Sequence, residues 1–359
     1  MTELVERSLR LIHEYQAETG AYPAAPGPAP YRNAWLRDGA FVADAMSRAG
    51  QIESAERFFG WCAAIVLERC EVIDRLVERH RAGNPVAVEE HLHARYTLSG
   101  REVPEAWPSF QLDGWGEWLW ALNAHVARHG RELSSLRDGV EPILVYLSEF
   151  ALEPTYDWWE ERLGQHSTTL AAVGAGLAGG ADLAFVCPTL REAARRKAAE
   201  VFAVVRGDAE ARGRLGRSLG DDLLDGSLIA CATPFRTFEP HEPVMAATVA
   251  ALEAELAHGG VHRYPGDSFY GGGEWLLLAA LLGWHYVELG RRADARAQLE
   301  WIAGHARGGG ELPEQVEDHL LVPEGLEEWR RRWGPSASPL LWSHAMFVTL
   351  ALELGESSR

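Results

Sequence analysis

The feature that most constrains the fold of this chain is a helical periodicity of apolar residues over almost its whole length. Apolar residues recur every three or four positions, and no sustained run of alternating β-branched residues indicates a strand. The pattern predicts about twelve helices, over residues 3–18, 38–49, 51–82, 113–129, 132–152, 165–179, 181–207, 221–231, 240–258, 273–290, 292–307 and 338–354.

The connections between these helices alternate in length. Some are tight turns, whereas others are long and rich in Gly, Pro and Trp, and long connections in compact domains usually serve function. Six helical hairpins arranged around a ring would place all the long loops on one face. The sequence therefore predicts an all-α fold, an (α/α)6 barrel, formed as a single domain by residues 1–359. The long connections are expected at 19–37, 83–112, 153–164, 259–272 and 308–337.

Composition limits the partners and the compartment. The formal net charge is −18, which disfavours nucleic acid and anionic membranes as partners because both require basic patches. The cysteines lack CxxC spacing, so neither a zinc site nor a disulfide framework is expected. The first residues are acidic where a signal peptide would be basic, and no apolar run approaches the roughly 20 residues of a membrane span. We therefore expect a cytoplasmic protein.

Three motifs have ordinary structural interpretations. The Gly174-x-Gly176-x-x-Gly179 spacing matches a dinucleotide-binding fingerprint but lacks a preceding strand, so close packing of a helix is favoured. The acids of 221–225 resemble a magnesium-diphosphate motif, but no second acidic site faces them, and a solvated helix start is favoured. The two histidines of 89–93 are too close together to bind one metal from a helix.

The long loops hold most of the residues that carry chemistry. Aromatic faces stack on the C–H groups of a pyranose, and charged groups bind its adjacent hydroxyls. A loop-lined pocket with such side chains is typical of a sugar site. The residues concerned are Trp35, Arg37, Asp38, Trp107, Asp113, Trp158, Trp159, Glu160, Arg263, Asp267, Glu314 and Trp333.

The segment 156–162 gives the most specific prediction. It places two tryptophans directly before paired carboxylates, and desolvation between indole rings favours a protonated carboxyl, as a general acid requires. A second acid, Glu314, also lies in a long loop, after three glycines. Two carboxyls from distant loops are the minimal equipment for glycoside hydrolysis.

Taken in order, seven segments of the chain resemble glycoside hydrolase family 15, the glucoamylase family, in a short form without the N-terminal β-sandwich domain of many relatives. Single segments would be weak evidence, but their order covers nearly the whole chain. They are Tyr31 to Asp38, Trp107 to Gly114, Tyr156 to Arg162 with His166 and Ser167, Asp222 to Leu228, Arg263 to Gly272, Leu312 to Gln315, and Pro339 to Ala345.

The resemblance implies an (α/α)6 barrel and an inverting exo-glucosidase that needs no metal or cofactor. By position in the family motifs, Glu160 is the expected general acid, Glu314 the general base, and Tyr31 a contact of the catalytic water and base. The two carboxyls should lie roughly 6.5–9.5 Å apart, which leaves room for the attacking water. The expected substrate contacts are Trp35, Arg37, Asp38, Trp107, Trp159, Glu161, Arg162, Arg263 and Trp342.

The missing β-sandwich and starch-binding modules favour a small oligosaccharide as substrate. We expect short α-glucosides, with isomaltose and isomalto-oligosaccharides ahead of malto-oligosaccharides. A trehalase on the same fold is the alternative, and a catalytically silent sugar-binding barrel is a remote one. Barrel surface left uncovered by the missing domain suggests a homodimer, which a light-scattering mass near 40 kDa would exclude.

Phe269 departs from the family pattern, which often has a tyrosine at this position. A hydroxyl that could hold Tyr31 or the base is then missing. We expect an altered pH profile rather than lost activity.

Overall fold

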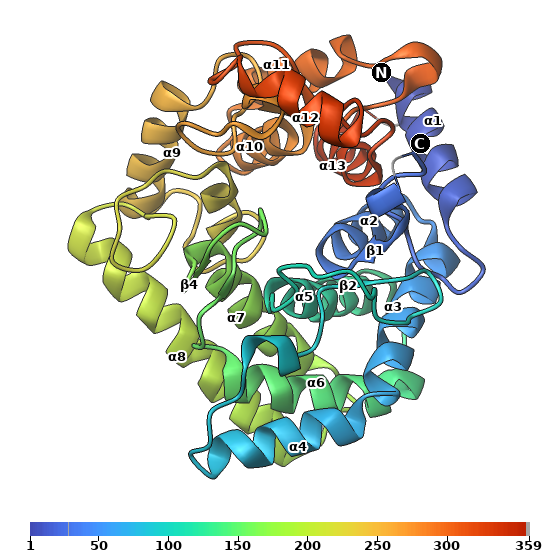
Figure 1. The fold of residues 1–359 in the computed structure, drawn as a ribbon, viewed down its shortest axis with the longest axis vertical. Helices are drawn as coiled ribbons and strands as arrows, with labels where there is room; N and C mark the ends of the chain where they lie inside the picture. Colours follow the sequence, from blue (N-terminus) through green and yellow to red (C-terminus); the bar gives the residue numbers. More distant parts are fainter. Residues whose placement is uncertain (28, 357–359) are drawn as a thin grey trace. The chain divides into compact units, whose positions relative to one another are not determined.

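The computed structural model describes residues 1–27 and 29–356, and helices account for most of them (Figure 1). The α-helices are α1 Thr2–Tyr15, α2 Leu36–Arg48, α3 Ile52–Leu67, α4 Cys70–Arg81, α5 Asp113–His129, α6 Arg137–Phe150, α7 Ser167–Asp182, α8 Pro188–Arg212, α9 Pro243–Glu255, α10 Leu276–Glu288, α11 Arg292–Gly304, α12 Gly325–Trp333 and α13 Leu341–Glu353. Short 3-10 helices are η1 Ala29–Arg32, η2 Val88–Glu90, η3 Ser134–Leu136, η4 Gly226–Cys231, η5 Phe269–Gly271 and η6 Gly308–Gly310.

The strands are only two residues long and form antiparallel pairs between loops. β1 (Ala34–Trp35) pairs with β2 (Arg95–Tyr96), and β3 (Thr155–Tyr156) pairs with β4 (Leu163–Gly164). β5 (Glu274–Trp275) pairs with β6 (Gln315–Val316), with Trp275 opposite Gln315. Each pair therefore fixes the base of a loop that carries predicted site residues. The all-α class predicted from the sequence is confirmed.

The contacts divide the chain into two compact units. One comprises Met1–Gln16, Pro23–Arg32 and Asp208–Arg359, and is called here the base unit because it contains Glu314. The other comprises Ala17–Tyr22 and Asn33–Gly207, and is called the acid unit because it contains Glu160. Within the described ranges 1–27 and 29–356, no helix is long and apolar enough to cross a bilayer.

The core of the acid unit is built around α5, which packs against α2 and α7. Glycines allow the closest approach: a Cβ on Gly176 would lie 2.3 Å from the carbonyl oxygen of Gly116, and one on Gly116 would lie 2.5 Å from that of Ala172. Neither position accepts a larger residue without moving a helix. The glycine motif of α7 thus serves helix packing, which confirms the structural interpretation of that motif.

In the base unit, α10 packs against α11 and α13, and α13 also packs against α1. The residues of α10 from Leu276 to Tyr286 are all buried, which explains why this helix shows no polar stripe. The first and last helices of the chain therefore lie side by side (Figure 1).

Four sequence predictions of helices and connections were wrong in detail. The helix predicted over residues 181–207 is α8, which begins at Pro188 and ends at Arg212. Residues 51–82 form two helices rather than one, since the chain turns at Glu68 and Arg69. The break was missed because no Gly or Pro marks it in the sequence. Residues 221–231 contain only η4, whose start is capped by the Asp225 carboxylate. The expected connection 308–337 contains α12, with acids in its first turn and arginines in its last. Those charges and Gly334 are helix start and stop signals that the sequence did offer.

Candidate active site

The Glu160 side chain is the centre of a hydrogen-bonded cluster in the acid unit. Its Oε1 accepts from the indole Nε1 of Trp35 at 2.6 Å and from Nε2 of Gln111 at 3.0 Å. Its Oε2 accepts from Nε1 of Trp107 at 2.6 Å. A guanidinium nitrogen of Arg37 lies 3.5 Å from Oε1. The carboxylate is therefore held by two indole N–H groups, an amide and the charged guanidinium of Arg37, and its side chain remains 13% exposed.

The loop between β3 and β4 presents this carboxyl. Glu160 has a φ of 65°, in the left-handed region that costs a non-glycine residue roughly 1–2 kcal/mol. Buried Asp157 holds the turn: its carbonyl oxygen accepts from the Glu160 amide at 2.9 Å, and its carboxylate accepts from the Glu161 amide at 2.8 Å. Strain of this kind persists where the surroundings impose it, and it concentrates at functional sites.

Arg37 links the carboxylates of the acid unit. It is buried, and it donates to Gln111 Oε1 at 2.8 Å and to Asp113 Oδ2 at 3.1 Å, while Asp38 lies at 3.8 Å. Burial disfavours the charged guanidinium, but the carboxylates of Asp113, Glu160 and Asp38 outweigh it and raise the pKa of Arg37. The guanidinium is therefore a fixed cation beneath Glu160.

Asp38 has an unusual titration. Burial raises its pKa to about 7, although the neighbouring Arg37 guanidinium favours the ionised form. A carboxyl that is partly protonated near neutral pH can donate to, or accept from, a sugar hydroxyl. Burial and the Asp113 charge also raise the pKa of Glu117, one turn further along α5.

Two residues of this cluster were not assigned a role from the sequence. Gln111 bridges Arg37 and Glu160, and it was visible only as part of a matching segment. Arg95 on β2 places its guanidinium 4.1 Å from the ring centroid of Trp107 and 5.3 Å from that of Trp35. Cation–π contact of this kind holds both indoles in place. The pairing of β2 with β1 brings Arg95 to these indoles, and no local pattern in the sequence predicts that pairing.

In the base unit, Glu314 lies directly before β6 and is buried. The Tyr31 hydroxyl donates to Glu314 Oε1 at 2.9 Å, and the Glu314 amide donates to the carbonyl oxygen of Ala337 at 2.9 Å. The Tyr270 side chain is close enough that burial, together with the Glu314 charge, raises its pKa to about 12. The predicted pair of Tyr31 and Glu314 is therefore formed.

The segment before Glu314 is held by two neighbouring side chains of α13. Ser343 Oγ donates to the Pro313 carbonyl oxygen at 2.8 Å, and His344 Nε2 accepts from the Leu312 amide at 3.0 Å. Burial lowers the pKa of His344 to about 3, which keeps the ring neutral and able to accept. Ser343 and His344 thus fix the backbone that carries Glu314.

Arg263 is already paired within the base unit. Its Nε and one terminal nitrogen donate to the two carboxylate oxygens of Asp267 at 2.7 and 2.6 Å, and both side chains are buried. The guanidinium also lies 4.9 Å from the ring of Phe269. A bidentate pair fixes the orientation of the guanidinium.

The structure gathers the predicted residues into these two sets. In the acid unit, Trp35, Arg37, Asp38 and Trp107 surround Glu160. Trp159, which precedes Glu160 in the chain, is buried against Trp158, while Glu161 and Arg162 are exposed. In the base unit, Tyr31 contacts Glu314, and Trp342 is buried on α13 next to Ser343. The separation of the two carboxyls stays a prediction.

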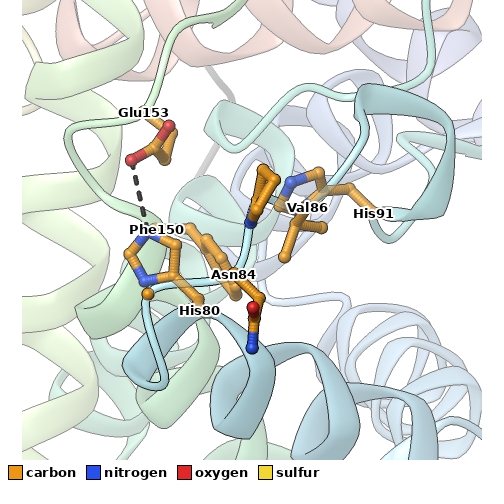
Figure 2. Close-up of a pocket in the computed structure, with 8 residues that line it drawn as sticks. His80, Asn84, Val86, His91, Phe150 and Glu153 are labelled. Atoms are coloured by element: carbon orange, nitrogen blue, oxygen red, sulfur yellow. Dashed lines mark ion pairs between the residues drawn. The ribbon is translucent and has the colours of Figure 1, made fainter.

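Figure 2 shows a different pocket, at the ends of α4 and α6 in the acid unit. His80 lies 3.4 Å from Glu153 and 2.8 Å from Glu149, and His91 stacks on Phe110 with 3.7 Å between ring centroids. Burial lowers the pKa of His91 to about 4. None of the predicted site residues lines this pocket.

A carboxyl held between indole N–H groups and a second carboxylate bonded to a tyrosine are the kinds of group that glycoside hydrolysis by acid and base catalysis requires. The comparison with known protein families identifies the family of glycoside hydrolases. The model of the glycosyl hydrolases family 15 matches residues 3–300, and the chain belongs to this family.

Known proteins match the chain over nearly its whole length. An isomaltose glucohydrolase of Kribbella flavida is 43% identical over 357 residues, which cover 98% of this chain and 93% of that protein. The solved structure of a wild-type glycosidase matches with a TM-score of 0.96 and 42% identity, covering 99% of this chain and 97% of that one.

A bacterial glucoamylase solved with acarbose matches with a TM-score of 0.78 at 20% identity, covering 99% of this chain and 56% of that one. At that identity the match shows the fold. The prediction of an (α/α)6 barrel is confirmed.

Proposed function

We propose that the chain is an inverting, exo-acting α-glucoside hydrolase that releases β-glucose from the non-reducing end of isomaltose and short isomalto-oligosaccharides, and from malto-oligosaccharides more slowly. The observation that carries this proposal is the 43% identity to an isomaltose glucohydrolase over 98% of the chain. The two carboxyl clusters supply the acid and the base that such a reaction requires.

In the proposed reaction, Glu160 donates a proton to the glycosidic oxygen and Glu314 removes a proton from the attacking water. The C1–O bond breaks as water attacks the opposite face, through an oxocarbenium-like transition state, so the configuration at C1 inverts. Tyr31, bonded to Glu314 at 2.9 Å, orients the base and its water. This role requires Glu314 to be ionised and Glu160 to be protonated at the start of each turnover.

The proposed substrate contacts follow the two clusters. Trp35 and Trp107 offer indole faces, and Arg37 and Asp38 offer charged groups for the hydroxyls of the non-reducing glucose. Trp159, Arg263 and Trp342 complete the set, and exposed Glu161 and Arg162 contact the leaving sugar. No step of this reaction uses a metal or a cofactor.

We further propose that the two units act as one catalytic domain, in the cytoplasm, where short imported glucosides rather than polysaccharides are the substrates. A homodimer would double the chain mass of 39.6 kDa, and light scattering of the purified protein measures this directly.

The first test is glucose release from equal concentrations of isomaltose, maltose and trehalose, with proton NMR of the initial anomer. We expect the highest rate with isomaltose, and β-glucose as the first product. Release from trehalose alone would change the substrate but keep the roles of the carboxyls. Early α-glucose would contradict inversion, and no release from any glucoside would favour a silent sugar-binding barrel.

The base cluster also predicts a pH effect. Phe269 packs against Tyr270 with ring centroids 4.8 Å apart, and it offers no hydroxyl to the Tyr31–Glu314 pair. A Phe269→Tyr variant adds one, which would change how the pair shares its proton. We expect a changed profile of kcat against pH, with maximal activity within about tenfold of the wild type. An unchanged profile would contradict this expectation, and Phe235→Tyr, in the same unit, is the control.

A further inference from the structure

Helix α12 is attached to the turn that carries Tyr270. The Val322 amide donates to the carbonyl oxygen of Gly271 at 2.9 Å, just before the helix begins. Gly325, its first residue, lies so close to this turn that a Cβ would approach the Ser268 carbonyl oxygen to 2.7 Å. Arg330 ties the helix back to the segment after β6 through Glu317 at 2.6 Å. The helix therefore has a fixed position within the base unit.

One side of α12 is aromatic. The ring of Trp329 lies 4.8 Å from that of Phe269 and is stacked on that of Tyr270, with centroids 6.2 Å apart and planes inclined by 30°. Trp333, one turn later, lies 6.4 Å from Trp329. The Arg332 guanidinium lies 5.4 and 5.8 Å from the two indole centroids.

This aromatic side is close to the candidate base. Tyr270 is buried, and the chain just after its turn contacts the neighbour of Glu314, because the Gly273 amide donates to Gln315 Oε1 at 3.1 Å. The Glu314 charge contributes to the raised pKa of the Tyr270 phenol.

The two indoles of α12 are packed against neighbouring side chains and are also partly accessible. All nine residues of α12 are described and none is fully buried, and Trp329 and Trp333 remain half-buried. The remaining side chains of the helix are mostly charged, which suits a helix that faces water. Large aromatic rings left accessible beside a sugar site commonly serve as stacking surfaces for the C–H faces of sugars.

We propose that Trp329, flanked by Trp333 and Arg332, forms the stacking surface for the leaving sugar of short α-glucosides. This inference rests on the proposed function and adds a subsite to it. The indole face receives the apolar face of the leaving glucose, and the Arg332 guanidinium is placed to bind one of its hydroxyls.

The test compares isomaltose with α-glucosyl fluoride, which has the same cleaved sugar but no leaving sugar. For Trp329→Ala we expect kcat/KM for isomaltose to fall about tenfold, through a higher KM, whereas kcat/KM for α-glucosyl fluoride changes by less than about twofold. Trp329→Phe, which keeps an aromatic face, should recover most of the loss. Trp301→Phe, on α11 of the same unit, is the matched control for the loss of an indole.

Equal losses on both substrates would overturn the proposal, because they would show that Trp329 acts only by supporting Tyr270. Unchanged kinetics on both substrates would overturn it as well. The wild-type rate on isomaltose tests the proposed function separately. If the wild type prefers another glucoside, the same comparison is made with that glucoside, so the subsite is tested even where the substrate assignment fails.

Discussion

A Glu160→Ala variant is expected to hydrolyse isomaltose about 10²- to 10⁴-fold more slowly than the wild type, since proton donation to the glycosidic oxygen contributes about that factor. Fluoride leaves as a weakly basic anion and needs little protonation. The variant should therefore retain α-glucosyl fluoride hydrolysis within about tenfold. Steady-state rates on the two substrates measure the difference.

Alanine is the better replacement here because of the cluster that holds Glu160. Both carboxyl oxygens accept an indole N–H, at 2.6 Å in each case. In Glu160→Gln the amide NH2 would face one of these donors, which leaves two N–H groups opposed and shifts the side chain. Glu132→Gln, at an exposed acid of the same unit, is the control for charge alone. A parallel loss on both substrates would contradict the role of general acid.

A Glu314→Ala variant has the opposite signature. Water must be deprotonated whichever group leaves, so hydrolysis of isomaltose and of α-glucosyl fluoride should both fall by about 10²- to 10⁴-fold. Azide attacks without losing a proton, and the shortened side chain leaves space for it. Added azide should therefore restore consumption of α-glucosyl fluoride and give β-glucosyl azide, identified by NMR.

The stereochemistry of this product tests the geometry as well as the residue. Formation of the β-azide requires attack from the face opposite to the leaving group, as in the proposed inversion. An α-azide would place the nucleophile on the wrong face and contradict the assignment of the base. Glu324→Gln, at an exposed acid just before α12, should behave as the wild type.

Much of the fold followed from the sequence because helix periodicity is local information. The predicted helix 113–129 matches α5 at both ends. At its C-terminal end, Gly130 in the left-handed conformation terminates the helix. The prediction failed where the ending signal is not local. The break between α3 and α4 lacks Gly or Pro, and Arg69 there is bonded to Glu102, which lies far along the chain.

The candidate site was only partly predictable for the same reason. Motif order identified Glu160 and Glu314, but the donors to Glu160 come from β1, from α2 and from the long loop before α5. Their convergence depends on strand pairs of two residues, which are too short to leave a pattern in the sequence. The left-handed φ of Glu160 and the contact of Arg95 with two indoles are likewise tertiary effects.

Two backbone contacts hold Glu314 in place, and neither depends on the length of the segment between residues 315 and 337. On one side, Gln315 pairs with Trp275 of β5; on the other, the Glu314 amide is bonded to Ala337. The segment between these two contacts, which includes α12, is therefore fixed at both of its ends. Insertions or deletions within this segment can therefore change the surroundings of the substrate during evolution, while the Glu314 carboxylate stays in place. New specificity can arise there without a new catalytic mechanism.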